Sequence, residues 1–195
     1  MRIIRQSAFK SVPWKNGGGV THEALRVPES GDRFRFRVSV ARIEASGAFS
    51  DFTGYARTMV LLRGAGLTLR FAAGESRALL RAGDLVEFDG AMPVTCELSE
   101  GPCVDLNLMV SSGAGPVRAR VERLTGPLAL PPEAARSTLI VPIDAAVDVL
   151  TAGESVRLEP WDLAVLGAAT PADAGCKVAP ASGAALAFVA AVPDP

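Results

Sequence analysis

Strict alternation of apolar and polar residues marks several short segments of this chain. The segment FRFRVSV (34–40) alternates along its whole length, and CVDLNLMV (103–110) does the same. Because successive side chains of a strand point to opposite faces, each segment predicts a β-strand with one apolar and one polar face. The apolar faces are Phe34, Phe36, Val38 and Val40 in the first strand, and Val104, Leu106, Leu108 and Val110 in the second.

Gly and Pro residues separate further strands. TMVLLRGAGLTLRF (58–71) predicts two strands around a Gly-Ala-Gly turn, and GDLVEF (83–88) predicts a turn that enters a strand. Only PPEAARS (131–137), with prolines at its start, suggests a helical turn. Short strands with this punctuation predict a mainly all-β protein built as a barrel or sandwich.

A weak internal repeat divides the chain. Gly74 recurs as Gly153, Asp84 as Asp162 and Pro93 as Pro171, at a nearly constant separation of about 80 residues. The repeated order of turn, strands, GDLVEF-like segment and turn proline resembles a cupin half-barrel. We therefore expect a bicupin with two jelly-roll halves, residues 1–112 and 113–195, packed as one globular unit and joined near SSGAGPVRAR (111–120).

Composition and charge exclude several classes of protein. A chain of 195 residues with 49% hydrophobic and 21% charged residues is long enough to bury a core. The net charge of −1 favours neither nucleic acid nor a membrane surface as partner. No segment has the length of a membrane span, and the N-terminus lacks the pattern of a signal peptide. Three cysteines without CxxC spacing are typical of reduced thiols, so we expect a cytoplasmic protein.

The sequence contains few residues that are plausible metal ligands. Many catalytic cupins hold a metal ion with several histidines and a glutamate, whereas His22 is the single histidine here. Only His22 and Glu23 are plausible ligands, and a lone histidine is more often structural. We therefore expect no metal and no cofactor.

The segment PWKNGGGVTHE (13–23) is the most unusual stretch of the chain. Three adjacent glycines allow a wide turn, but they also allow the backbone to approach a ligand closely. The segment lacks the spacing of a nucleotide-binding loop. Its side chains suit a small polar ligand, and we take as candidate binding residues Trp14, Lys15, Asn16, Gly17, Gly18, Thr21 and Glu23.

Four segments in order resemble the successive motifs of the HutD/Ves family. They are PWKNGGGVTHE, FRFRVSVARIEASGAFSDFTGYAR, LLRGAGLTL and DLNLMV, whose order and spacing match the family from residue 1 to about 110 and more weakly beyond. The resemblance implies a bicupin fold in a bacterial cytosolic protein. It also implies a link to histidine-utilisation genes, where a role in limiting expression has been proposed, and it brings no established catalytic activity.

Three polar residues outside the glycine-rich segment complete the candidate site. Arg57 follows the loop GAFSDFTGYAR (47–57), and its guanidinium fork matches the two oxygens of a carboxylate. It could instead form a salt bridge with Glu44 or Asp51. Asp105 and Asn107 point to solvent if the apolar face of their strand covers the barrel core. They line a cavity if that strand is covered on both sides.

The second half is expected to be structural. Trp161 and Asp162 occupy the positions that correspond to Gly83 and Asp84, which suggests a packed turn rather than a second site. No counterpart of WKNGGG occurs there, so a single pocket in the first half is the simplest expectation.

Three functions fit these features. The leading hypothesis is a regulatory protein that binds a small carboxylate, such as urocanate or a formylated glutamate, through Arg57 and Lys15 with Trp14 as an apolar wall. The alternative is a metal-independent isomerase, lyase or hydrolase with Glu23 or Asp105 as general base. The third is an interaction module that uses the fold as a scaffold. A homodimer formed through sheet edges stays an open option.

Overall fold

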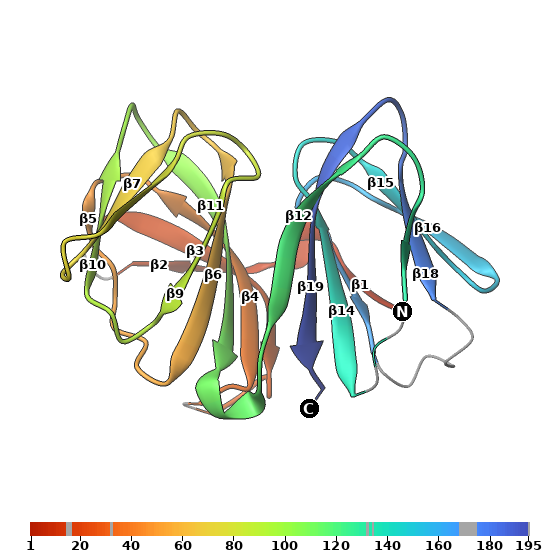
Figure 1. Cartoon of the computed structure of the whole chain (residues 1–195), viewed down its shortest axis with the longest axis horizontal. Coiled ribbons are helices and arrows are strands. Elements are labelled where there is room, and N and C mark those ends of the chain that lie inside the picture. The colour runs from red at the N-terminus through yellow and green to blue at the C-terminus, as the bar shows by residue number, and fades with distance from the viewer. Residues whose placement is uncertain (15–16, 32, 132, 134, 168–174, 195) are drawn as a thin grey trace. The chain divides into compact units, whose positions relative to one another are not determined.

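Among the residues that the structure describes, the fold is all β apart from two short 3-10 turns (Figure 1). The computed structural model describes residues 1–14, 17–31, 33–131, 133, 135–167 and 175–194. These residues form two compact units, Phe9–Gly115 (the cavity unit) and Met1–Ala8 with Pro116–Pro195 (the second unit). Nearly all of the predicted strands are present, which confirms the all-β prediction.

The cavity unit consists of two antiparallel sheets. One sheet has the strand order β2-β3-β4-β11-β6-β9 and the other the order β5-β10-β7-β8. The strands are β2 (Lys10–Pro13), β3 (Gly19–Val27), β4 (Phe36–Ile43), β5 (Gly47–Ala48), β6 (Tyr55–Arg63), β7 (Leu67–Phe71), β8 (Ser76–Leu79), β9 (Leu85–Asp89), β10 (Val94–Leu98) and β11 (Cys103–Ser111), followed by the turn η2 (Ser112–Ala114).

Within the described parts of the chain, the second unit repeats this arrangement in eight strands, whereas β2 and β3 have no counterpart in it and β1 has none in the cavity unit. Its sheets have the orders β1-β17-β14-β19-β12 and β13-β18-β15-β16, so β12, β19, β14 and β17 correspond to β4, β11, β6 and β9. The elements are β1 (Arg2–Ile4), η1 (Gln6–Ala8), β12 (Arg118–Leu124), β13 (Leu128–Leu130), β14 (Arg136–Pro142), β15 (Val147–Thr151), β16 (Glu154–Leu158), β17 (Leu163–Leu166), β18 (Cys176–Pro180) and β19 (Ala185–Pro193). The duplicated strand order accounts for the sequence repeat.

The corresponding turns also share their backbone geometry. Gly83 has a φ of 93°, and Trp161, which takes its place in the second unit, keeps a positive φ of 72°. The Trp161 Nε1 donates a hydrogen bond to the Ile143 carbonyl at 3.0 Å. Hydrogen bonds from both the ring and the backbone amide of Trp161 hold it in this left-handed conformation, which is rare for a residue with a side chain. The turn is therefore a packed structural one.

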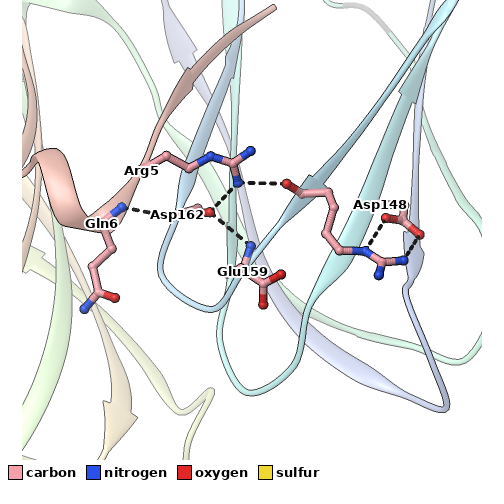
Figure 2. A network of polar contacts seen from close by, with 6 residues as sticks. Arg5, Gln6, Asp148, Glu159 and Asp162 are labelled. Atoms are coloured by element: carbon pink, nitrogen blue, oxygen red, sulfur yellow. Dashed lines mark hydrogen bonds and ion pairs between the residues drawn. The ribbon is translucent and has the colours of Figure 1, made fainter.

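Two boundary predictions need correction. Residues 1–8 belong to the second unit and not to the first half, because β1 pairs with β17 in antiparallel register. Arg5 and Gln6 both bind the buried carboxylate of Asp162, which fixes this N-terminal segment to the second unit (Figure 2). The helical turn predicted at 131–137 is wrong at its C-terminal end, because Arg136 and Ser137 begin strand β14.

The interior of the cavity unit changes from apolar to polar along its strands. Ile43, Cys103 and Leu61 pack in an apolar cluster at one end of β4, β11 and β6. Four residues further along each strand, on the same face, the side chains are those of Ser39, Asn107 and Arg57, all of them buried. The alternate face of β11 is buried as well, so both faces of this strand are covered.

Candidate functional site

A cavity of about 520 Å³ occupies the polar end of the cavity unit. The six-stranded sheet forms one side, and β5 with the segment that follows it forms the other. Its polar lining is Thr21, Glu23, Arg37, Ser39, Ser50, Arg57, Asp105 and Asn107, and its aromatic lining is Trp14, Phe49 and Phe52. This volume is in the range of small-molecule sites in proteins.

Strand register arranges the polar groups in two rows across the sheet. Glu23 of β3 lies opposite Ser39 of β4, which in turn lies opposite Asn107 of β11. In the neighbouring row Arg37 and Arg57 both lie opposite Met109, one from each side. Side chains of one face therefore converge from four adjacent strands, which are labelled in Figure 1.

Arg57 is a buried cation that lacks a counter-ion among the described residues. It is 5% exposed, and its Nε and Nη2 both donate to Oδ1 of Asn107, at 3.3 and 3.0 Å. No carboxylate oxygen of the described residues lies within 4.0 Å of the guanidinium. The salt bridges considered for Arg57 are absent within that part of the chain, because Glu44 pairs with Arg42 and Asp51 binds Thr53.

Three phenyl rings surround the Arg57 guanidinium. The Cζ atom lies 5.2 Å from the centre of Phe49, 5.4 Å from Phe52 and 4.8 Å from Phe88. Burial lowers the pKa of Arg57 to about 10, and Asp105 partly opposes that change. The rings stabilise the charged guanidinium, but the cost of burying its charge is larger, so the pKa of Arg57 is lowered.

Asn107 connects Arg57 to a buried carboxyl group. Its Nδ2 donates to Oδ2 of Asp105 at 2.7 Å, while its Oδ1 accepts from Arg57. Burial raises the pKa of Asp105 to about 7, although the hydrogen bond from Asn107 and the charge of Arg57 both act to lower it. Both Asp105 and Asn107 therefore face the cavity, as one of the two sequence-based alternatives predicts.

Trp14 and Thr21 form one wall of the cavity. The Trp14 Nε1 donates to Oγ1 of Thr21 at 2.8 Å, and its ring meets Phe49 edge to face at 6.4 Å. Lys15 and Asn16, also predicted to bind a ligand, lie outside the described residues. The described lining includes neither Gly17 nor Gly18, so the structure does not bring these two predicted residues to the cavity.

The glycines instead build the turn between β2 and β3. Gly17 has a φ of 70°, which an L side chain rarely adopts. The Gly18 carbonyl accepts from the backbone amide of Glu44 at 2.9 Å. A Cβ on Gly19 would lie 2.3 Å from the backbone oxygen of Arg42 and 3.2 Å from Cε3 of Trp14. The absence of a side chain at Gly19 thus allows β3 to approach β4 below the Trp14 ring.

We predict that Gly19→Ala destabilises the cavity unit by roughly 2 kcal/mol, because β3 must move away from β4. The shift should also displace the Trp14 ring, which a change in its fluorescence would report. The control is Gly113→Ala, since a Cβ at Gly113 meets no atom within 4 Å. Equal effects of the two substitutions in urea unfolding would contradict the close-approach explanation.

Sequence reasoning missed several residues of the cavity, and four of them matter most for its chemistry. Arg37 and Ser39 stand on the polar face of the predicted strand 34–40, and Phe49 and Phe52 lie in the loop that precedes Arg57. The Arg37 Cζ lies 5.4 Å from the Phe52 ring, and burial lowers the pKa of Arg37. The one available signal is that three arginines alternate with aromatic residues, but that pattern also fits a solvated strand face.

The described residues contain no cluster of three or more His, Cys, Asp or Glu side chains able to hold a metal ion. His22 lies on β3, where its Nδ1 is 2.8 Å from Oγ of Ser11. Within the same part of the chain, no helix is long and apolar enough to cross a membrane.

Fold and cavity together define a cupin-like β protein with a buried arginine in one of its two units. The fold is similar to that of oxalate decarboxylase from Bacillus subtilis, at 12% identity and a TM-score of 0.68 over 100% of this chain and 77% of that one. A sequence profile of the HutD family matches residues 6–186, and the chain belongs to that family.

Individual relatives agree with this assignment. The chain is 36% identical over 158 residues to an uncharacterized 21.2 kDa protein in the hutC 3′ region of Pseudomonas putida, covering 80% of this chain and 81% of the relative. HutD from Pseudomonas fluorescens SBW25, solved in a formate condition, is 30% identical with a TM-score of 0.81, covering 100% of this chain and 99% of that one. A conserved protein of unknown function from Pseudomonas aeruginosa PAO1 is also 30% identical, with a TM-score of 0.88 and coverage of 100% and 98%. The family is associated with histidine-utilisation genes.

Proposed function

We propose that the cavity unit binds a small carboxylate and that the protein acts as a ligand-responsive regulator of histidine utilisation. The observation that carries this proposal is the buried Arg57, whose guanidinium has no carboxylate partner among the described residues. A buried charge without a counter-ion is strongly unfavourable. A bound anion would neutralise the Arg57 charge and remove this cost.

The geometry around Arg57 suits a carboxylate. Asn107 occupies its Nε and Nη2, and among the described residues Nη1 donates no hydrogen bond. Nη1 and the second hydrogen of Nη2 can therefore donate to a ligand. Arg57 is only 5% exposed, and this low exposure to water strengthens its attraction to an anion.

The family association narrows the candidate ligands. Acids formed during histidine breakdown, such as urocanate or a formylated glutamate, are the first to test. HutD from Pseudomonas fluorescens was solved in a formate condition, and formate is the smallest carboxylate. The degree of regulation of histidine utilisation would then depend on the concentration of the acid. The protein would act either by changing metabolite levels or by binding a protein partner.

The test is Arg57→Met, assayed by isothermal titration and thermal shift with a panel of pathway acids. Wild-type protein at a ligand concentration one hundred times Kd should gain about 2.7 kcal/mol in its free energy of unfolding. We expect Arg57→Met to abolish that gain. The ligand-free variant should have nearly the stability of wild type, because loss of the hydrogen bonds to Asn107 is offset by removal of a buried charge that no carboxylate of the described residues contacts.

The matched control is Arg63→Met, an exposed position at the end of the same strand. It should bind the acid as wild type does. Binding that survives Arg57→Met would refute the proposal, and so would a ligand-free variant that fails to fold.

A second candidate function is acid–base catalysis on the bound acid. A specific observation favours it, namely that burial raises the pKa of Asp105 to about 7 inside the same cavity. A general base works best with a pKa near the operating pH. Recovery of the unchanged acid after long incubation, followed by NMR, would leave binding as the function. Conversion that is lost in Asp105→Asn would establish an enzyme.

A further inference from the structure

A second polar group in the cavity lacks protein partners. Glu23 lines the cavity from β3, and among the described residues its carboxylate has no hydrogen bond and no ion pair. Glu23 attracts Arg37 at longer range, and this attraction raises the pKa of Arg37 against the stronger effect of burial. Glu23 therefore offers free acceptor oxygens to whatever fills the cavity.

Arg37 stands beside Glu23 and is also incompletely paired. Its Nε is buried and makes no hydrogen bond within the described part of the chain. Phe34 and Phe52 flank the guanidinium, with their ring centres 5.6 and 5.4 Å from Cζ. Nη1 and Nη2 of Arg37 donate no hydrogen bond to a described residue either, so these two groups are the donors that Arg37 offers in the cavity beside Glu23.

Arg37 and Glu23 lie apart from Arg57 but within reach of one short ligand. Arg37 and Arg57 flank Met109 on the two strands adjacent to β11, which separates their Cα atoms by roughly 10 Å. Both Cζ atoms lie 5.4 Å from the Phe52 ring, so the two guanidinium groups are at most twice that distance apart. Glu23 is on β3, the neighbour of β4 on the side away from Arg57.

We propose that Glu23 and Arg37 together recognise a neutral amide at the end of the ligand opposite its Arg57-bound carboxylate. This inference rests on the proposed function and names the chemical class of ligand for the same cavity. An amide carbonyl accepts from Arg37 while its N–H donates to Glu23, so one group satisfies both residues.

Other groups satisfy this pair less well. A second carboxylate would accept from Arg37 but would face the negative charge of Glu23, and the aromatic side chains limit the water that could screen it. An ammonium group would pair with Glu23 but would be repelled by Arg37. Glu23 is therefore the residue that makes the cavity select an amide acid over a diacid.

The experiment compares acids that differ in a single group. Glutarate and its monoamide have nearly the same shape, as do succinate and its monoamide, and each pair exchanges one carboxylate for one carboxamide. Isothermal titration of wild-type protein should show the better-fitting monoamide binding roughly tenfold tighter or more than its diacid.

Glu23→Gln should shift the binding preference away from the monoamide and toward the diacid. The new side-chain amide can donate to a carboxylate and carries no charge, so the diacid should gain roughly tenfold in affinity while the monoamide gains nothing. Glu44→Gln, which changes an exposed glutamate paired with Arg42, should leave the preference of wild type intact.

The outcomes separate this inference from the proposed function. Binding of both acids that is lost in Arg57→Met, without any preference for the monoamide, would overturn the role of Glu23 alone. Equal changes for both acids in Glu23→Gln would do the same. Absence of binding by any of these acids and by the pathway acids would overturn both proposals.

Discussion

Asp162→Ala is expected to lower the free energy of unfolding of the second unit by roughly 2 to 4 kcal/mol, because each buried donor left without its acceptor costs about 1 to 3 kcal/mol. The Asp162 side chain is 5% exposed and accepts from Arg5 Nη1 at 2.7 Å. It also accepts from the backbone amides of Gln6, at 2.8 Å, and Glu159, at 3.0 Å. Figure 2 shows this carboxylate between the N-terminal segment and the turn before β17. Alanine leaves both amides without this acceptor and frees the segment that carries β1.

Fluorescence can restrict this measurement to the second unit. The chain has two tryptophans, Trp14 in the cavity unit and Trp161 next to Asp162. In a Trp14→Phe background, urea unfolding followed by the remaining tryptophan reports the second unit directly.

Asp148→Ala is the matched control for Asp162→Ala. Asp148 accepts from Arg157 Nε and Nη2 at 3.0 and 3.2 Å, in the same view of Figure 2, but Arg157 is 57% exposed. Exposed ion pairs contribute less than about 1 kcal/mol, so this variant should remain close to wild type. If the two variants lost similar amounts of unfolding free energy, burial of Asp162 would not explain the stabilising effect of its hydrogen bonds.

Asp105→Asn is expected to stabilise the ligand-free protein above pH 7 by up to roughly 4 kcal/mol. The pKa of Asp105 is about 7 in the folded protein, against 3.8 for an ordinary aspartate. Between these two values the folded state binds more protons than the unfolded state, so the stability of wild type falls as pH rises from about 4 to 7. The variant removes this titration, and its side-chain oxygen can still accept from Asn107.

The measurement is the free energy of unfolding as a function of pH for both proteins. The two curves should converge near pH 4 and separate as pH rises, with the variant the more stable. Asp89→Asn, an exposed position in the same unit, should follow the wild-type curve. Parallel curves for wild type and Asp105→Asn between pH 4 and 8 would contradict the burial of a carboxyl that titrates near 7.

Local patterns predicted the strands well because strand formation depends on alternation and turn residues. The segment 103–110 became β11 and 58–71 became β6 and β7. The repeat at Gly74 and Gly153 reflects turns with φ values of 91° and 93° in the two units. The turn predicted at 131–137 was wrong at its C-terminal end, because the first residue of β14, Arg136, is fixed by its pairing with β19.

The site was predicted less completely than the fold. Trp14, Thr21, Glu23 and Arg57 do line the cavity, and they come from segments whose residue types already pointed to a ligand. Arg37 was assigned to an ordinary strand face, because a single strand does not reveal what lies opposite it. Gly17 and Gly18 were taken for ligand contacts, but their places are set by the turn between β2 and β3.

The sequence by itself determined that the chain is mainly β, that its structural unit is repeated and that its candidate binding residues all lie in the first half. Only the tertiary structure decided which face of β4 and β11 lines the cavity. Apolar alternation normally identifies the inward face, yet here both faces of β11 are buried, and the polar one holds Asp105 and Asn107. Burial depends on which elements pack against a strand, and those elements are distant in the sequence.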